Sequence, residues 1–198
     1  MSDTAQAKRA LRRQMRARRR ALTATARRRQ QRQLQARLAA LLRRRGLRRV
    51  GLYRAVASEL DLGALASALP RRTQALYPRM RRHGLVFVPA HPRWQATAVR
   101  TLEPAGRVQW PVWSLDVLLL PLLACDARGM RLGQGGGWYD RTLAGSRWRR
   151  PLCVGVGFDE QYTTTVPAAA HDAPLDVYLS ARIARAFTPR GQRWLTGF

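Results

Sequence analysis

The sequence predicts an α/β protein in which a central β-sheet lies between layers of helices. Short apolar stretches with strand composition alternate along the chain with segments of helical periodicity. One of these stretches, Leu115–Leu120, is almost continuously apolar, which is typical of a central strand that is covered on both faces. The 198 residues, 46% of them hydrophobic, are enough for one domain with a substantial core, and we expect residues 1–198 to form a single domain.

The N-terminal segment, residues 1–46, is predicted to form two basic helices that pack on this domain. In the first, from Thr4 to Leu22, one stripe carries the apolar side chains Ala7, Leu11, Met15 and Leu22. Thr23 is the expected N-cap of the second helix, on which Leu34, Leu38, Leu41 and Leu42 follow the i, i+4, i+7, i+8 pattern. We expect this second helix to end at Gly46, with the glycine in the left-handed backbone conformation.

The hydrophobic period changes after this second helix. Val50–Tyr53 is a predicted strand, and Leu60–Leu69 is a predicted helix closed by Pro70. Further strands are predicted at Gln74–Tyr77, Leu85–Val88, Leu115–Leu120, Leu152–Gly157 and Val177–Leu179, the first two each ending at a proline. Residues 182–198 predict a peripheral C-terminal tail with a helix and a loose end.

The cellular compartment is predicted from three features that the sequence lacks: membrane-spanning segments, a secretory signal and a disulfide framework. The longest wholly apolar run, Val117–Cys125, contains a proline and is far shorter than the roughly 20 residues of a spanning helix. The N-terminus lacks the apolar stretch of a secretory signal. Two cysteines, Cys125 and Cys153, cannot form a disulfide framework. We therefore expect a cytoplasmic protein without a membrane segment.

The formal net charge of +26 is weaker evidence for a nucleic-acid partner than it first suggests. Of the 37 basic residues only Lys8 is a lysine, asparagine is absent and Ile183 is the only isoleucine, which indicates a genome-wide bias toward GC-rich codons. Residues 1–49 hold 18 of the basic residues and one acidic residue. Non-specific binding to polyanions at low salt is expected, but no dedicated nucleic-acid partner.

The strongest local motif is the glycine-rich segment Arg131–Asp140. Its four glycines, Gly133, Gly135, Gly136 and Gly137, allow the backbone to form a nest of N–H groups, and a predicted helix begins just beyond. Arg131 and Arg141 flank the nest, and together these features favour phosphate binding over a plain flexible turn. The segment is neither a P-loop nor a dinucleotide-binding fingerprint, because residue 138 is a tryptophan where the third glycine would stand.

Several acidic residues have both a functional and a structural interpretation. Asp140 could bind Mg²⁺ beside a phosphate, or could complement the helix dipole. Glu59 lies past the carboxyl end of the first strand, where ligands bind in open α/β sheets, but it could simply be an N-terminal charge of the next helix. Asp172 and Asp176 could bind a metal or cap a turn.

The first helix carries a possible phosphate contact. Lys8 and Arg12 are four positions apart and share one face of the helix. An ammonium is a compact point charge that suits phosphate, although a solvated helix face is the alternative. Zinc enzymes and nucleophilic hydrolases are disfavoured, because the three histidines, His83, His91 and His171, have no metal-ligand spacing and no serine lies in a nucleophile elbow.

Over roughly residues 7–180 the chain resembles the 5-formyltetrahydrofolate cyclo-ligases, also called 5,10-methenyltetrahydrofolate synthetases. The specific part is the glycine-rich segment with the Asp126-x-x-Gly129 that precedes it. The segments that carry the resemblance are, in order, Lys8–Arg12, Tyr53 with Glu59 six residues on, Asp116–Pro121, Asp126–Asp140 and His171–Asp176.

The resemblance implies a three-layer α/β/α sandwich of the CoA-transferase-like kind, with a mostly parallel, mixed central sheet. It also implies a monomeric, ATP- and Mg²⁺-dependent ligase that converts 5-formyltetrahydrofolate to 5,10-methenyltetrahydrofolate and releases ADP and phosphate. In such enzymes the formyl oxygen is thought to attack the γ-phosphate, so the protein supplies positioning and charge rather than a nucleophile.

The same resemblance implies a set of site residues. ATP contacts would be Lys8, Arg9, Ala10, Leu11, Arg12, Arg131, Leu132, Gly133, Gln134, Gly135, Gly136, Gly137, Trp138 and Tyr139, of which Lys8, Arg12 and Arg131 would be catalytic. Folate contacts would be Arg54, Glu59, Gln134, Gly135, Gly136, Gly137 and Trp138. Asp140 and Asp172 would bind Mg²⁺.

The chain departs from the family pattern in three places. Trp138 stands where tyrosine or phenylalanine is usual, Cys125 replaces a phenylalanine, and the segment Gly106–Pro111 lacks the glutamate often found before that proline. The aromatic residue that covers the pterin could be Trp110, Trp113 or Tyr139. Two other functions stay open at this point: a nucleic-acid-binding protein that uses the basic helices, and a non-catalytic folate- or nucleotide-binding member of the same fold.

Overall fold

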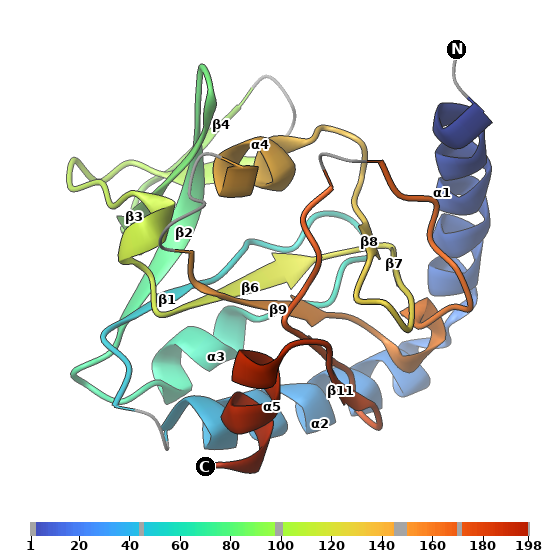
Figure 1. Ribbon diagram of the computed structural model, residues 1–198. Coiled ribbons are helices and arrows are strands. Elements are labelled where there is room, and N and C mark those ends of the chain that lie inside the picture. The colour runs from blue at the N-terminus through green and yellow to red at the C-terminus, as the bar shows by residue number, and fades with distance from the viewer. Residues whose placement is uncertain (1–2, 44–45, 98–100, 145–149, 170–171, 198) are drawn as a thin grey trace.

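Seven strands form the central sheet of the computed structural model, which describes residues 3–43, 46–97, 101–144, 150–169 and 172–197 (Figure 1). They are β1 (Arg49–Gly51), β2 (Gln74–Arg81), β3 (Gly84–Pro89), β6 (Val117–Pro121), β9 (Leu152–Val156), β10 (Val177–Leu179) and β11 (Ala184–Ala186). Their order is β11-β10-β9-β6-β1-β2-β3. The strands from β10 to β2 are parallel, and β11 and β3 are antiparallel edges, so the prediction of a mostly parallel, mixed sheet is confirmed.

The strands follow the predicted ones closely, with one correction at Pro78. This proline does not end β2; the strand continues to Arg81 and pairs with β3 as a hairpin. Strand β1 accompanies β2 only as far as Leu76, so at Pro78 the neighbour is β3 alone. A residue without an N–H is tolerated there because one edge of the strand is unpaired.

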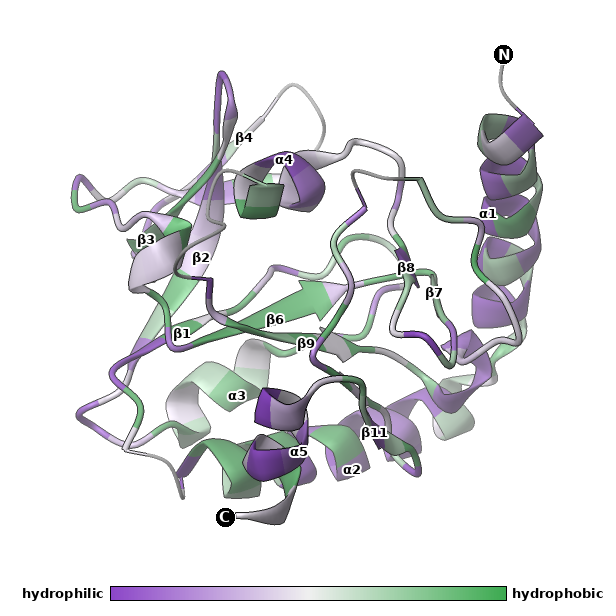
Figure 2. Ribbon diagram, in the orientation of Figure 1, coloured by the Kyte–Doolittle hydropathy of each residue, from purple (hydrophilic) through white to green (hydrophobic). Residues whose placement is uncertain are grey.

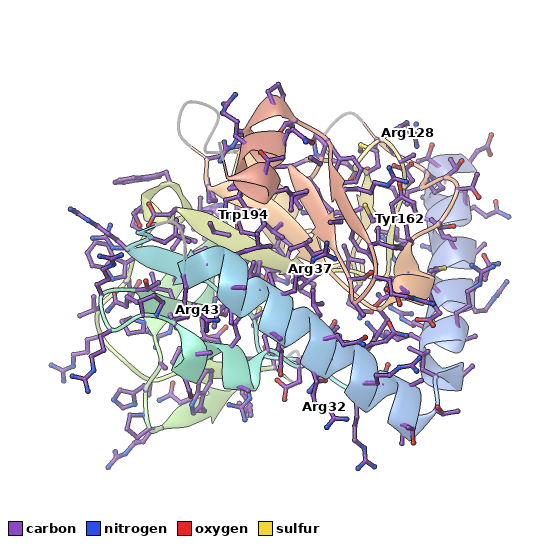
Figure 3. The ribbon with its side chains drawn as sticks, turned by 90° about the horizontal axis from the view of Figure 1, so that it is seen from below. Arg32, Arg37, Arg43, Arg128, Tyr162 and Trp194 are labelled. Carbon is purple, nitrogen blue, oxygen red and sulfur yellow. The ribbon has the colours of Figure 1, made fainter. Side chains whose placement is uncertain are left out.

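Three helices cover one face of the sheet (Figures 1 and 3). They are α2 (Ala24–Arg43), α3 (Gly63–Ala68) and α5 (Pro189–Thr196). The predicted N-cap of α2 is confirmed, because Thr23 Oγ1 accepts a hydrogen bond from the Ala26 N–H at 3.2 Å. The predicted leucine stripe of α2 is buried, and Figure 3 shows Trp194 of α5 beside this helix.

The opposite face of the sheet has a thinner cover, made of α4 (Trp138–Ala144), a 3-10 helix over Val112–Ser114 and several loops. Phe87, Leu143 and Tyr178 belong to the buried cluster on this side. Figure 2 shows that β6, which lies between the two covered faces, is almost entirely hydrophobic. Its burial on both faces confirms the interpretation of the apolar run as a central strand.

Helix α1 (Asp3–Ala21) lies beside the layers, at the end of the molecule toward which β6 points (Figure 1). It packs against a short ribbon formed by β7 (Ala124–Cys125) and β8 (Arg131–Leu132). Met15 is fully buried there, in a cluster with Leu123, Ala124, Leu132 and Val166, and Leu11 packs against it. The other buried residue of α1 is Arg19, so this helix contacts the rest of the domain through both apolar and charged side chains.

Some elements were not predicted from the sequence. They are β7 and β8, the edge strand β11, and a second ribbon formed by β4 (Trp94–Ala96) and β5 (Leu102–Pro104). Each has only two or three residues, too few for a hydrophobic period to be visible. Among the described residues, no helix combines the length and the apolar character needed to cross a bilayer.

Candidate functional site

A cleft of about 1260 Å³ lies between α1 and the carboxyl ends of the central strands. Its walls are α1, the loop of residues 53–59 that follows β1, the glycine loop of residues 133–137 and the start of α4. All the predicted site residues line it except Ala10 and Leu11. Ala10 is exposed and Leu11 packs toward the β7–β8 ribbon, so both lie on other faces of α1. Sequence segments that are far apart therefore meet in one place.

Lys8 is held at the cleft by an ion pair with Asp172. The distance from Lys8 Nζ to Asp172 Oδ2 is 2.5 Å, and the two side chains are only 13% and 10% exposed. The same carboxylate oxygen accepts a hydrogen bond from the Ala169 N–H at 2.7 Å. The His171 of the predicted motif lies outside the described residues. An ammonium next to a carboxylate at the edge of the cleft can change partners when a phosphate or a metal ion binds.

A second ion pair joins Arg131 and Asp140. Arg131 Nη1 lies 2.8 Å from Asp140 Oδ1, and the Arg131 side chain is 5% exposed. The Ala173 N–H also points to Asp140 Oδ1, at 3.4 Å. Because Ala173 directly follows Asp172, this contact brings the two predicted Mg²⁺ ligands into the same corner of the cleft.

The donor set of this corner fits Mg²⁺ bound together with a nucleotide. Mg²⁺ is commonly held by one or two carboxylates, with phosphate oxygens and water completing its shell. Asp140 uses only Oδ1 for its hydrogen bonds with described residues, and its side chain is 24% exposed. Among the described residues there is no cluster of three or more acidic, histidine or cysteine side chains, so a bound ion would depend on ligands from the phosphates.

The glycine loop contains two residues with positive φ angles, which is a feature of anion-binding nests. Gly135 and Gly137 have φ angles of +113° and +64°, which other residues rarely adopt. Arg12 Nε donates a hydrogen bond to the Gly133 carbonyl at 3.0 Å. Just beyond the loop, the Arg141 guanidinium lies over the Trp138 ring, 4.7 Å from its centroid. The loop is thus hydrogen-bonded to a cation from α1 and is followed at once by a second cation on α4.

The loop of residues 53–59 is joined directly to the glycine loop. Gln134 Nε2 donates to Glu59 Oε1 at 2.9 Å, while Glu59 Oε2 accepts the Val56 N–H at 3.1 Å. Arg16 of α1 donates to Gln134 Oε1 at 3.0 Å. Because α3 begins only at Gly63, Glu59 is not its N-terminal charge, and the structural interpretation of this residue is wrong. Glu59 instead links two walls of the cleft.

Two tyrosines lie at the deep end of the cleft. Burial, and next the nearby Glu59 carboxylate, raise the pKa of both Tyr53 and Tyr139 above the ordinary value for a phenol. Both are therefore neutral at physiological pH. Tyr53 donates its hydroxyl hydrogen to the Leu60 carbonyl at 2.7 Å. Of the three predicted covers for a pterin, only Tyr139 lines the cleft; Trp110 is bonded to the backbone of β3, and Trp113 is 50% exposed at the surface.

The structure also shows that Asp172 and Asp176 have different roles, which the sequence left open. Asp176 is fully buried and accepts hydrogen bonds from the Cys153 N–H at 2.8 Å and the Thr188 hydroxyl at 2.8 Å. It fixes α5 to the sheet and does not line the cleft. The cysteines are also structural: burial raises the pKa of the Cys153 thiol to about 11, so it is protonated and unreactive at neutral pH.

Sequence reasoning missed several residues of the site. Arg19 of α1 and Glu103 of β5 line the cleft. A side cavity of about 400 Å³ opens behind Arg54 and is walled by Tyr77 and Trp94. A buried arginine among many arginines gives no signal in the sequence, and Trp94 lies on a ribbon too short to be predicted.

Comparison with known proteins places the chain in a family. A sequence model of the 5-formyltetrahydrofolate cyclo-ligase family matches residues 4–180. The 5-formyltetrahydrofolate cyclo-ligase of Haemophilus influenzae is 33% identical over 144 residues, covering 68% of this chain and 76% of the relative. That of Escherichia coli is 34% identical over 134 residues, covering 64% and 74%.

The fold agrees with these matches. The solution structure of Aquifex aeolicus 5,10-methenyltetrahydrofolate synthetase superposes with a TM-score of 0.79 at 26% identity, covering 91% of this chain and 92% of that one. The match of sequence over most of the chain, and of fold over nearly all of it, agrees with the cleft and its motifs. The chain is an enzyme, and it belongs to the 5-formyltetrahydrofolate cyclo-ligase family.

Proposed function

We propose that the cleft binds 5-formyltetrahydrofolate and ATP with Mg²⁺, and forms 5,10-methenyltetrahydrofolate with release of ADP and phosphate. The observation that carries this proposal is the convergence of Lys8, the glycine loop and two carboxylates beside the Glu59 loop. A nest of N–H groups with nearby cations suits the phosphates, and an adjoining wall of tyrosines with a carboxylate suits a flat heterocycle that donates hydrogen bonds.

The phosphates of ATP would bind at the amino-terminal half of α1. Lys8 and Arg12 would approach them from this helix, and the N–H groups of residues 133–137 from the opposite wall. Arg131, which is almost fully buried, would hold Asp140 in place and add positive charge. Arg9, Leu132 and Tyr139 complete the proposed nucleotide contacts in the cleft.

Mg²⁺, when bound, would be held by Asp140 and Asp172 and would neutralise charge on the phosphates. On binding of the nucleotide, Lys8 would leave Asp172 for a phosphate oxygen. The carboxylate released by Lys8 would then be available as a ligand. The two ion pairs of the structure would thus keep both cations and both carboxylates in position before the substrates arrive.

The reaction needs no protein nucleophile. The formyl oxygen of the folate attacks the γ-phosphorus, a new O–P bond forms, and the bond from the γ-phosphorus to the bridging oxygen of ADP breaks. The folate N10 then attacks the activated carbon and loses its proton to the departing phosphate, which leaves with the former formyl oxygen. Lys8, Arg12 and Arg131 would stabilise the charge on the transferred group, and the two loops would align the reactants.

The folate would lie against the second wall of the cleft. Glu59 would accept hydrogen bonds from the donor edge of the pterin, and Tyr139 would contact its ring. Arg54 and the side chains of Gln134 and Trp138 would contact the rest of the molecule. Arg54 lies over the Trp94 ring at 4.6 Å, so its guanidinium is already held beside the side cavity.

The test is the growth of methenyl-folate absorbance from 5-formyltetrahydrofolate, with and without Mg-ATP. We expect product only with both, and an Asp140→Asn variant should need at least about tenfold more Mg²⁺ for half-maximal rate, because a neutral amide is a weaker ligand. Asp3→Asn, which removes an exposed carboxylate at the start of α1, is the matched control. Turnover without ATP, or an unchanged Mg²⁺ requirement in Asp140→Asn, would contradict the proposal.

A further inference from the structure

Arg19 is an unusual member of the basic α1 helix because it is buried. Its exposed fraction is 4%, whereas its neighbours Arg18 and Arg20 are exposed. Its Nε donates a hydrogen bond to the Ser58 hydroxyl at 3.0 Å. Arg27 of α2 holds the same corner, with bonds to the Ser58 carbonyl at 2.7 Å and the Arg19 carbonyl at 2.6 Å. The guanidinium of Arg19 is therefore fixed in position.

The outer nitrogens of this guanidinium have no hydrogen-bond acceptor among the described residues. Within the described ranges, the only hydrogen bond of the Arg19 side chain is the one from Nε. The Arg19 Nη atoms are not fully enclosed, and Arg19 lines the cleft. Its free N–H groups thus open on the cleft, where a ligand can supply the acceptor.

The surroundings of Arg19 indicate which kind of acceptor this is. The Glu59 carboxylate is near enough to influence Arg19, and burial lowers the pKa of the guanidinium. Because Arg19 Nε is hydrogen-bonded to Ser58, the residue before Glu59, a neutral group that both donates and accepts can use the guanidinium and the carboxylate together. Arg19 is also eleven residues beyond Lys8, about 16 Å along the helix from the proposed phosphate site.

A pterin presents such a group on its pyrimidine edge. The 2-amino group and N3–H donate, and the neighbouring C4 carbonyl accepts. We propose that Arg19 binds the C4 carbonyl oxygen of the folate while Glu59 accepts from the adjacent N–H groups. This assignment rests on the proposed function, because it takes 5-formyltetrahydrofolate as the ligand of the cleft. It adds a substrate-binding residue on α1, next to Ser58 of the loop of residues 53–59.

The test compares two ligands in the full-length protein by direct titration of binding. The first is 5-formyltetrahydrofolate, and the second is its analogue with an amino group in place of the C4 carbonyl oxygen. In Arg19→Met the dissociation constant for the first should rise about 10- to 100-fold, the effect of losing a hydrogen bond from a charged donor. Affinity for the 4-amino analogue, which offers no acceptor at C4, should change by less than about threefold.

Two further variants complete the design. Arg18→Met removes the same charge from an exposed neighbour that does not line the cleft, and should leave both affinities unchanged. Arg19→Lys keeps the positive charge but lacks the planar guanidinium. Its affinity for 5-formyltetrahydrofolate should fall less than that of Arg19→Met, and its affinity for the 4-amino analogue should not change. This variant provides the test if Arg19→Met does not fold.

Equal losses for both ligands would overturn the assignment, since they would mean that Arg19 only positions the loop of residues 53–59. Unchanged affinity for both ligands in Arg19→Met would overturn it as well. If the unmodified protein does not bind 5-formyltetrahydrofolate, the proposed function itself fails, and this result is distinct from the two others.

Discussion

At the scale of single residues, Lys8 is the side chain in which sequence and structure agree most closely. It is the one lysine of a chain with 37 basic residues, and it lies at the cleft in contact with Asp172. An ammonium concentrates its charge on one atom, whereas a guanidinium spreads it over a planar fork. The position therefore suits a direct contact with one phosphate oxygen.

Lys8→Ala should lower kcat/KM for the cyclo-ligase reaction at least about 100-fold, because it removes a charge that stabilises the transferred phosphoryl group. Lys8→Arg should restore only part of this loss. The absorbance assay measures both, and thermal unfolding of each variant checks that the fold is intact. Arg18→Ala changes an exposed residue of the same helix and should keep full activity. Full activity in Lys8→Ala would show that Lys8 does not take part in catalysis.

Asp126 is a buried carboxylate with a purely structural role. Burial by itself raises its pKa, but hydrogen bonds from the Val166, Met130 and Arg128 N–H groups and the Arg128 guanidinium together bring the pKa below the ordinary value for an aspartate. A pKa that is lower in the folded than in the unfolded state stabilises the fold above the unfolded pKa, near 4. This stability is lost as the pH falls through the folded pKa.

Asp126→Asn should therefore destabilise the protein at pH 7 by about 1–3 kcal/mol, and its free energy of unfolding should depend less on pH below about pH 4. Denaturant unfolding between pH 2 and pH 7 measures both effects. Asp3→Asn, at an exposed site, should leave the curve as it is. If the free energy of unfolding of Asp126→Asn depends on pH as it does in the unmodified protein, the ionisation of Asp126 does not contribute to stability.

At the scale of elements, the glycine loop depends on backbone conformations that only glycine adopts easily. Gly135→Ala places a side chain at φ +113°, with its Cβ 3.5 Å from Arg12 Cζ. We expect the loop to change shape and the affinity for ATP to fall at least about tenfold, because the N–H groups would no longer converge. Equilibrium binding of ATP measures this. Gly46→Ala also has a positive φ, +58°, but lies outside the cleft, so it should reduce stability slightly and leave ATP binding unchanged.

The predicted elements show where periodicity is informative. The leucine stripe of α2 and the apolar run of β6 specify their burial directly, and both were predicted correctly. The helix predicted from Leu60 to Leu69 is shorter, with α3 beginning at Gly63. Leu60 and Leu62 are buried in the core without being helical, so apolar spacing alone overestimated the helix.

At the scale of the whole molecule, the net charge of +26 makes association with polyanions unavoidable at low salt. Part of this charge lies outside the cleft, on exposed arginines of α1 (Arg13 and Arg18) and of α2 (Arg28, Arg29, Arg32 and Arg43). Binding to a duplex DNA of random sequence should be measurable at 50 mM salt and about 10³–10⁵-fold weaker at 200 mM, as expected for 6–10 phosphate contacts. Fluorescence anisotropy measures this. Affinity that persists at physiological salt with a preference among sequences would instead indicate a dedicated nucleic-acid function.

The sequence by itself predicted the fold class, the positions of the main strands and helices and the glycine loop, and it marked Lys8, Glu59 and Asp140 as candidate site residues. These features leave local traces, since periodicity, glycine spacing and motif order can be seen within short stretches. Only the tertiary structure decided that Lys8 meets Asp172, 164 residues away, that Asp176 is structural, and that Arg19 faces the cleft. Those outcomes depend on how distant segments approach one another, and a sequence rich in arginine does not mark the one guanidinium that packing encloses.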